Sequence, residues 1–276
     1  MPYRRLVVRA GLTLGGTIAL LAGLHALATS RTYQLFGHLV AHGPRTTPAV
    51  ALTFDDGPTQ DPLDSLLATL AAHEVHATFF VTGRELAAAP EAARRLVHAG
   101  HELGNHTYSH RHMVLMSPRA IRDEIEATDS LIRLAGYTGP IYFRPPYGTK
   151  LLGLPWYLSR HHRTSVTWDV EPDSYREVSR TAEGIVRHVL ARVGPGSIIL
   201  LHPWYRSRGT SLAAVRPLLD SLQARGFRVV PLRELLGGSG RDSTALAMPC
   251  PGELPPGGPS LRLPPDVQSR PCGQSS

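Results

Sequence analysis

The stretch Val50-Ala51-Leu52-Thr53-Phe54-Asp55-Asp56-Gly57-Pro58 decides the fold that this sequence predicts. Its first five residues are apolar, β-branched or aromatic and predict a buried strand, which Gly57-Pro58 ends. The two aspartates then lie where a strand meets a loop, which in parallel α/β proteins is the end that binds ligands. Adjacent residues of an extended chain point to opposite sides, so one carboxylate can bind a metal while the other serves acid–base chemistry. Asp-Asp-Gly-Pro is equally typical of a plain turn before a helix, so other motifs must decide.

Length and charge limit the possible classes of protein. The chain has 276 residues, enough for one domain of about 200 residues with appendages. The net charge is +7, but the basic residues are scattered as single arginines. This pattern argues against a nucleic-acid-binding surface and suits a protein near anionic envelope polymers. Both cysteines, Cys250 and Cys272, fall near the C-terminus, which excludes a cysteine-based metal site or catalytic thiol in the body of the chain.

The two ends of the chain differ from its body. Residues 1–29 begin with arginines, continue with an apolar run and end with Ala26-Leu27-Ala28, which predicts a cleaved signal peptide or a single membrane anchor. In both cases the rest of the chain would lie outside the cytoplasm. We expect residues 30–47 to be a linker and residues 48–236 to be the folded domain. Residues 237–276 hold 8 prolines and 7 glycines and predict a disordered tail, which a Cys250–Cys272 disulfide would close into a loop.

Strands and helices alternate through the predicted domain, which indicates parallel strands with helices outside them. The expected strands after residue 54 cover 77–81, 141–143, 164–168, 197–201 and 228–230. The expected helices cover 61–73, 85–99, 118–134, 156–160, 182–192 and 211–225.

Two histidines four residues apart suggest a metal site. On one helical turn, His106 and His110 would face the same way and could share a divalent ion. Surface histidines that bind nothing are the plain alternative. With Asp56 the set becomes two imidazoles and one carboxylate, which leaves open metal positions for water and substrate.

Two later motifs also follow predicted strands. In Arg144-Pro145-Pro146-Tyr147-Gly148 the prolines fix the backbone, and the guanidinium of Arg144 can orient a carboxylate. Leu200-Leu201-His202 places a histidine at the C-terminal edge of an apolar strand, where it is either a functional group or a capped core histidine.

Taken together, the motifs resemble those of the NodB-homology polysaccharide deacetylases, carbohydrate esterase family four. They are residues 53–58 (Thr-Phe-Asp-Asp-Gly-Pro), 106–110 (His-Thr-Tyr-Ser-His), 144–148, 168–175 (Trp-Asp-Val-Glu-Pro-Asp-Ser-Tyr) and 200–202. The resemblance spans about residues 48–236 and implies a distorted (β/α)7 barrel. It also implies an enzyme that uses Zn²⁺, or Co²⁺ or another divalent ion, to remove acetyl groups from an N-acetylated glycan such as peptidoglycan or chitin.

The resemblance also assigns roles to single residues. Asp56, His106 and His110 would bind the metal, Asp55 would be the general base that activates water, and Arg144 would orient Asp55. His202 would be the general acid, and Glu171, or its rival Asp169, would hold it protonated. The backbone N–H of Tyr147 would stabilise the oxyanion. The expected substrate-binding residues are Tyr147, Pro146, Trp168, Tyr175 and Leu200.

The sequence departs from the family pattern near two of these residues. Glu171 stands where the family usually has Asp, and Ser174-Tyr175 replaces the usual Asp-Trp, which puts the wall of the acetyl pocket in question. Pro203 follows His202 in place of a frequent Asp. Two alternatives remain: an O-acetyl esterase or small-molecule amidase on the same fold, and a catalytically silent glycan-binding module. Retention of both base and acid argues against the silent module.

Overall fold

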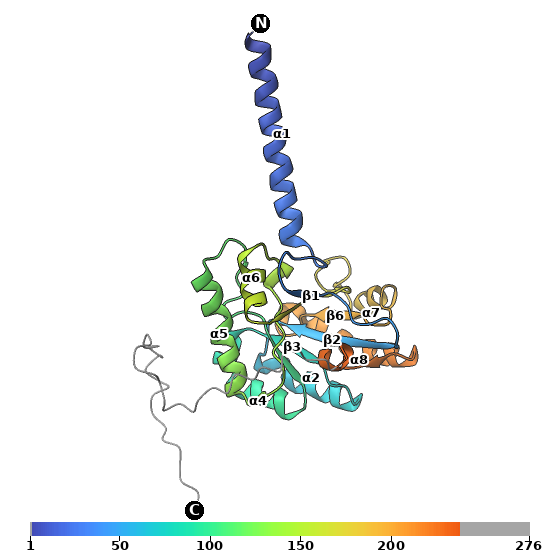
Figure 1. The fold of residues 1–276 in the computed structure, drawn as a ribbon. Helices are drawn as coiled ribbons and strands as arrows, with labels where there is room; N and C mark the ends of the chain where they lie inside the picture. The colour runs from blue at the N-terminus through green and yellow to red at the C-terminus, as the bar shows by residue number, and fades with distance from the viewer. Residues whose placement is uncertain (1, 238–276) are drawn as a thin grey trace, which may run out of the picture. The chain divides into compact units, whose positions relative to one another are not determined.

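The computed structural model describes the backbone of residues 2–237 and the side chains of residues 13–237 (Figure 1). The tail predicted for 237–276, including both cysteines, lies outside the described residues except for Gly237. The strands are β1 (His38–Val40), β2 (Ala49–Asp55), β3 (Thr78–Val81), β4 (Glu102–Asn105), β5 (Thr164–Val166), β6 (Ile198–Leu201) and β7 (Arg228–Val229). The α-helices are α1 (Pro2–Thr29), α2 (Gln60–Ala72), α3 (Gly83–Ala88), α4 (Pro90–His98), α5 (Pro118–Leu134), α6 (Gly153–Arg160), α7 (Ala182–Leu190), α8 (Gly209–Ala224) and α9 (Leu232–Leu235). Two 3-10 turns, η1 (Pro146–Gly148) and η2 (Arg206–Arg208), complete the elements.

Strand β2 is the centre of the sheet, as its sequence predicts. All seven of its residues are buried, as expected for a strand that is covered on both faces. It pairs in parallel with β3 on one side and β6 on the other, and β7 pairs with its first two residues. The hydrogen-bonded order is β4-β3-β2-β6. Parallel pairing places the carboxyl ends of these strands, with the motifs that follow them, at one edge.

Further parallel contacts continue this row of strands. β1 pairs with β5, and isolated parallel bridges join Phe143 to both β4 and β5 and Val170 to β6. Only Phe143 of the strand expected over 141–143 forms such a bridge. The predicted α/β class is confirmed, and the row of parallel strands is consistent with a distorted (β/α)7 barrel.

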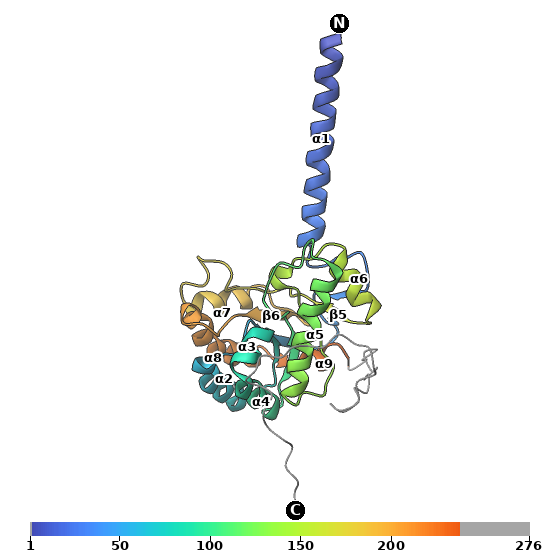
Figure 2. The ribbon, with the colours of Figure 1, turned by 90° about the vertical axis from the view of Figure 1, so that its left-hand side faces the viewer.

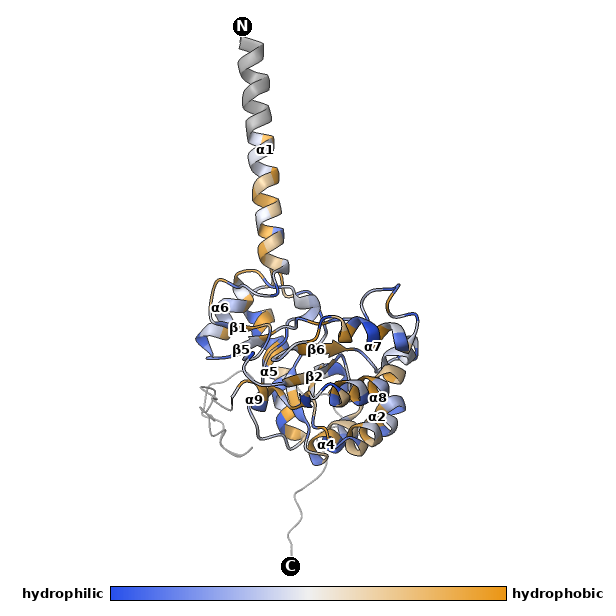
Figure 3. Ribbon diagram, turned by 90° about the vertical axis from the view of Figure 1, so that its right-hand side faces the viewer, coloured by the Kyte–Doolittle hydropathy of each residue, from blue (hydrophilic) through white to orange (hydrophobic). Residues whose placement is uncertain are grey.

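The helices cover the strands with their apolar faces. Leu63, Leu66 and Leu70 of α2 are fully buried, and so are Leu218 and Leu222 of α8. Figure 3 shows orange, hydrophobic segments on β2 and β6 and a mixture of colours along α2 and α8. Burial of each such leucine contributes roughly 1.5–3 kcal/mol, so this layer holds the strand ends in fixed positions.

The helix expected over 85–99 is two helices in the structure. α3 ends at Ala88 and α4 begins at Pro90, and the two lie next to each other in Figure 2. Pro90 has no N–H to donate, and its ring forces Ala89 out of the helical region, to φ −135° and ψ 61°. Proline at the first position of a helix ends the preceding one.

The linker expected over 30–47 contains folded structure, which corrects that prediction. Residues 38–40 form β1, in register with residues 164–166 of β5. A three-residue strand that pairs with a partner more than a hundred residues away has no periodic signal of its own. Within the part of the chain that the structure describes, no helix is long and apolar enough to cross a membrane. The signal peptide or anchor over residues 1–29 stays a prediction.

Candidate active site

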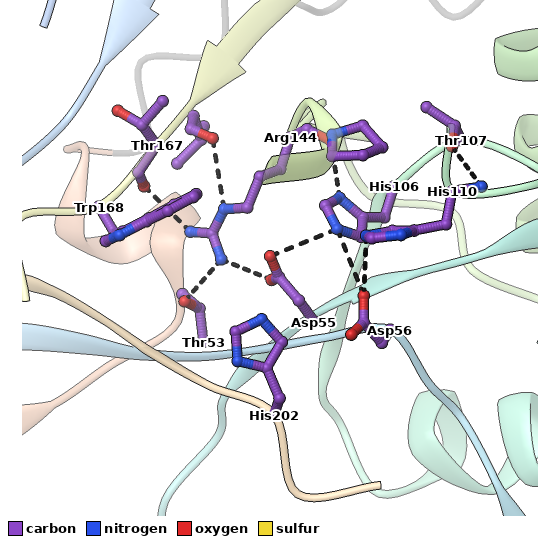
Figure 4. Close-up of polar contacts among 12 residues, drawn as sticks. Thr53, Asp55, Asp56, His106, Thr107, His110, Arg144, Thr167, Trp168 and His202 are labelled. Atoms are coloured by element: carbon purple, nitrogen blue, oxygen red, sulfur yellow. Dashed lines mark hydrogen bonds and ion pairs between the residues drawn. The ribbon is translucent and has the colours of Figure 1, made fainter. Parts of the chain in front are cut away.

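Three side chains that the sequence proposes as metal ligands converge at the ends of β2 and β4. Asp56 directly follows β2, His106 directly follows β4, and His110 lies in the loop that continues from it. One possible ligand atom from each lies within 4.8 Å of the others. Asp56 Oδ1 is 3.1 Å from His110 Nε2 and 3.6 Å from His106 Nε2 (Figure 4). The structure therefore brings the predicted triad together.

The chemistry of this donor set fits a divalent metal ion. Asp56 Oδ1 is buried and has no hydrogen-bond partner in the structure. His106 Nδ1 lies 2.7 Å from the carbonyl oxygen of Arg144, so the ring proton sits on Nδ1 and the lone pair of Nε2 faces the carboxylate. Burial outweighs the nearby Asp56 charge and lowers the pKa of His106 to about 3, which keeps the ring neutral. A lone pair that faces a carboxylate is favourable only when a cation lies between them.

A loop, not a helical turn, brings the two imidazoles together, so the expected helical geometry is wrong. Thr107 and His110 have φ values of +67° and +56°, in the left-handed region that costs energy for residues other than glycine. Asn105 Oδ1 accepts the backbone N–H of Thr107 at 2.8 Å, and Thr107 Oγ1 accepts that of His110 at 3.1 Å. These two hydrogen bonds, and not a helical turn, hold the loop in the conformation that brings the two histidines together.

Asp55 and Asp56 both face His106 Nε2, each with one carboxylate oxygen at 3.6 Å, which corrects the expectation that they point to opposite sides. The extended strand ends at Asp55, and the positive φ of Asp56 turns its side chain back toward the same histidine. Asp55 Oδ1 accepts a hydrogen bond from Arg144 Nη1 at 2.6 Å, and Asp55 Oδ2 is 3.6 Å from His106 Nε2 (Figure 4). Burial raises the pKa of Asp55, although the charges of Arg144 and His202 oppose the rise. A buried carboxylate with a raised pKa is a stronger proton acceptor than an exposed one.

Arg144 is fully buried and holds Asp55 in place, as the sequence predicts. Its guanidinium also donates to Thr53 Oγ1 at 2.9 Å and to the carbonyl oxygens of Val166 (3.3 Å) and Thr167 (3.0 Å). The same group lies 3.9 Å above the ring of Phe80. A buried cation needs several hydrogen-bond acceptors, and these acceptors fix the orientation of the guanidinium group toward Asp55.

Gly57 allows the chain to turn sharply after Asp56. A Cβ atom at this position would lie 2.1 Å from Trp204 Cε2, so no larger residue fits against that buried ring. Asp56 itself has a φ of +80°. The turn aims the Asp56 carboxylate at the histidines.

His202 directly follows β6, and its partner is Asp173, which corrects the prediction of Glu171 or Asp169. His202 Nδ1 lies 3.0 Å from Asp173 Oδ1, and the backbone N–H of His202 donates to Asp173 Oδ2 at 2.7 Å. Burial alone would lower the pKa of His202, but the Asp173 hydrogen bond and charge, with Asp55 and Asp56, raise it to about 9. The same contacts lower the pKa of Asp173. His202 is therefore a protonated acid at neutral pH.

Comparison with known proteins identifies the family. The model for "Polysaccharide deacetylase" matches residues 42–164. A peptidoglycan-N-acetylglucosamine deacetylase of Bacillus cereus is 36% identical over 193 residues, 69% of each chain. The chain belongs to the polysaccharide deacetylase family. Membership makes it a hydrolase, as the motifs predict.

Two further members of the family extend the comparison. A chitooligosaccharide deacetylase of Bradyrhizobium sp. is 35% identical over 201 residues, 68% of this chain and 91% of that relative. A crystal structure of a peptidoglycan N-acetylglucosamine deacetylase superposes with a TM-score of 0.67 at 30% identity, and covers 71% of this chain and 91% of that one. The similarity thus extends over nearly the whole of a short family member.

The two acids expected beside His202 have other partners in this family member. Asp169 accepts hydrogen bonds from Ser197 Oγ at 2.9 Å and from the Ile198 backbone at 2.7 Å. Glu171 accepts from the indole Nε1 of Trp168 at 2.8 Å. Asp173 lies inside the 168–175 motif, two residues beyond Glu171. The signal in the sequence for this partner is that the 168–175 motif contains a third acidic residue.

The expected substrate-binding residues divide into a buried and an exposed set. Trp168 and Leu200 are buried in one apolar cluster, and the Trp168 ring lies 5.5 Å from the guanidinium of Arg144. Pro146 is buried too. Tyr147, 57% exposed with φ +58°, sets its ring edge-on to His110, with centroids 4.7 Å apart. Tyr175 stacks on His188 of α7. The structure therefore places Trp168 and Tyr147 beside catalytic-site groups, and Tyr175 against a helix.

Proposed function

We propose that the chain is a metal-dependent deacetylase that removes acetyl groups from N-acetylated amino sugars of a cell-wall polysaccharide. One observation carries the proposal: the Asp56–His106–His110 triad lies beside Asp55, which Arg144 holds in place. The charges of Asp55 and Asp56 also help to raise the pKa of His202. A base and an acid next to one metal site are what hydrolysis of an amide requires.

Asp56, His106 and His110 would hold the metal ion, and zinc is the first candidate for two imidazoles and one carboxylate. Cobalt or another divalent ion is a second candidate. When bound, the ion polarises the acetyl carbonyl and lowers the pKa of water at the site.

The side chains divide the proton transfers between them. Asp55 accepts the proton of the attacking water, and Arg144 fixes the direction of the accepting carboxylate. The backbone N–H of Tyr147 donates to the acetyl oxygen as negative charge develops there. His202 then gives its proton to the departing sugar nitrogen, because an amide anion is too basic to leave unprotonated. Asp173 keeps His202 charged until that step.

The substrate and the location rest on the family members. Relatives named as peptidoglycan and chitooligosaccharide deacetylases act on N-acetylglucosamine polymers, and a net charge of +7 suits an anionic wall. The proposal places the enzyme outside the cytoplasm, with residues 1–29 as the export segment. A fusion of residues 1–48 to a reporter should carry the reporter out of the cytoplasm. A soluble reporter in the cytosol contradicts this placement.

A substrate panel tests the proposed activity. The purified full-length chain is incubated with peptidoglycan fragments, chitooligosaccharides and O-acetylated xylan, and products are identified by mass spectrometry. We expect loss of one acetyl mass from the N-acetylated sugars, stopped by a chelator and restored by zinc. The Asp56→Ala variant is the inactive control. Release from xylan alone favours the O-acetyl esterase alternative, and no release at all with intact metal binding favours the silent module.

A further inference from the structure

The C-terminal end of α1 and the two residues that follow it lie against two loops of the active site. The backbone N–H of Lys150 donates to the carbonyl oxygen of Ala28 at 2.9 Å, and Lys150 Nζ donates to that of Ser30. Thr167 Oγ1 donates to the carbonyl oxygen of Arg31 at 2.6 Å. Lys150 follows the Tyr147–Gly148 turn, and Thr167 precedes Trp168. Residues 28–31 thus join two loops that α6 and β5 separate in the sequence.

The Arg31 side chain continues this contact to Glu171 and Trp168. Its Nη2 lies 2.7 Å from Glu171 Oε2, and its guanidinium lies 4.8 Å above the Trp168 ring. Glu171 is 9% exposed and also accepts hydrogen bonds from Trp168 Nε1 (2.8 Å) and Ser174 Oγ (2.6 Å). A nearly buried carboxylate needs a counter-charge, and Arg31 supplies it from outside the predicted domain.

Trp168 in turn lies beside the Tyr147–Gly148 turn and Arg144. A Cβ atom at Gly148 would lie 3.3 Å from Trp168 Cη2, so the indole packs directly on the turn that carries the Tyr147 N–H. The carbonyl oxygen of Thr167 accepts from Arg144 Nη2 at 3.0 Å, and Arg144 holds Asp55. A displacement of the indole would therefore reach both the oxyanion donor and the arginine that orients the base.

We propose that Arg31 is a positioning residue of the active site, which acts through Glu171 and Trp168 on the Tyr147–Gly148 turn. This inference rests on the proposed deacetylase function. It assigns a role to residues 28–31, which the sequence alone divides between an export segment and a linker. A mature chain that lacked Arg31 would leave the Glu171 carboxylate without its ion pair at 2.7 Å.

The test compares three full-length variants by steady-state kinetics on an N-acetylated chitooligosaccharide. Arg31→Ala is expected to lower kcat about tenfold with KM changed by less than about twofold, because the affected donor acts on the transition state. Arg31→Lys keeps the charge beside Glu171 and should recover part of the loss. Arg228→Ala is the matched control, since Arg228 forms an exposed ion pair with Glu234 at 3.0 Å on β7, away from these loops. The kcat and KM of Arg228→Ala should equal those of the parent chain.

A double-mutant cycle shows whether Arg31 acts through Glu171. In the Glu171→Gln background, Arg31→Ala should lower kcat by less than about twofold further, because the charge that Arg31 compensates is gone. Near-ultraviolet circular dichroism should change in Arg31→Ala but not in Arg228→Ala, as the Trp168 surroundings change. If the parent chain is active and Arg31→Ala has the same kcat and KM as the parent, this proposal is wrong and the proposed function is unaffected. An inactive parent chain overturns the proposed function and this inference with it.

Discussion

Asp173 holds His202 through both oxygens of one carboxylate. Oδ1 faces His202 Nδ1 at 3.0 Å, while Oδ2 accepts the backbone N–H of His202 and the hydroxyl of Ser211, each at 2.7 Å. The ring is therefore fixed in orientation as well as charged. An acid with a pKa of about 9 stays protonated over the whole neutral range.

The first prediction concerns the pH dependence that this contact sets. In Asp173→Asn the carboxylate charge is lost, so the pKa of His202 should fall from about 9 toward its ordinary 6.5. His202 must be protonated to act as the acid, so the alkaline limb of kcat/KM should move to lower pH. Glu171→Gln is the control, because Glu171 does not contact His202, and it should leave that limb in place. If the alkaline limb of kcat/KM moves equally in both variants, Asp173 is not the residue that holds His202 protonated.

The Asp173–His202 pair should also affect how the stability of the folded chain depends on pH. A histidine whose pKa is raised on folding contributes stability that is fully present below its unfolded pKa of about 6.5. That contribution is lost as the pH rises through about 9. Thermal unfolding of parent and Asp173→Asn chains should therefore differ most below pH 6.5 and converge above pH 9.

The second prediction concerns the buried Arg144–Asp55 pair. Arg144→Met leaves the Asp55 carboxylate buried without its counter-charge, which typically costs roughly 3–5 kcal/mol. Denaturant unfolding measures this loss in the free energy of unfolding. The loss should shrink as the pH falls, because a protonated Asp55 no longer needs a cation. Arg144→Met combined with Asp55→Asn should recover part of the stability, and failure to recover any would show that the ion pair is not the cause.

The sequence predicts those parts of the site that depend on strand ends. Asp55 ends the apolar strand β2 and Asp56 directly follows it, while His202 directly follows the apolar strand β6. Parallel pairing of β2 with β6 brings these positions to one edge. The two histidines of the metal triad are indicated by their four-residue spacing, although Glu-Leu-Gly-Asn before His106 does not predict β4. The buried run of β2 and the helix faces on either side are equally local signals.

The parts that the sequence does not predict depend on contacts between distant segments. Nothing local distinguishes Asp173 from Asp169 and Glu171 as the partner of His202, because the choice is made by where the loop after Trp168 meets β6. The loop conformation at Thr107 depends on the Asn105 side chain, not on residue spacing. β1 exists only through its pairing with β5. Each of these features is fixed by tertiary context.

The third prediction concerns the metal ligands. Asp56→Ala removes the only carboxylate of the triad and should abolish zinc binding by the purified chain, measured by elemental analysis after dialysis. Asp123→Ala, an exposed position on α5, is the matched control and should bind as much zinc as the parent. Full zinc occupancy in Asp56→Ala would show that the ion binds elsewhere.

The last prediction separates the acid from the base. His202→Ala should lower the rate on an N-acetyl substrate on the order of 10²–10⁴-fold, because the departing nitrogen loses its proton donor. On an activated aryl acetate the loss should be much smaller, since a phenolate leaves without protonation. Asp55→Ala should damage both reactions alike, because both require an activated water. The rates of both variants on both substrates are measured under saturating zinc. Equal losses on amide and ester for His202→Ala would exclude it as the acid, and His202 would then serve to support the oxyanion or the metal site.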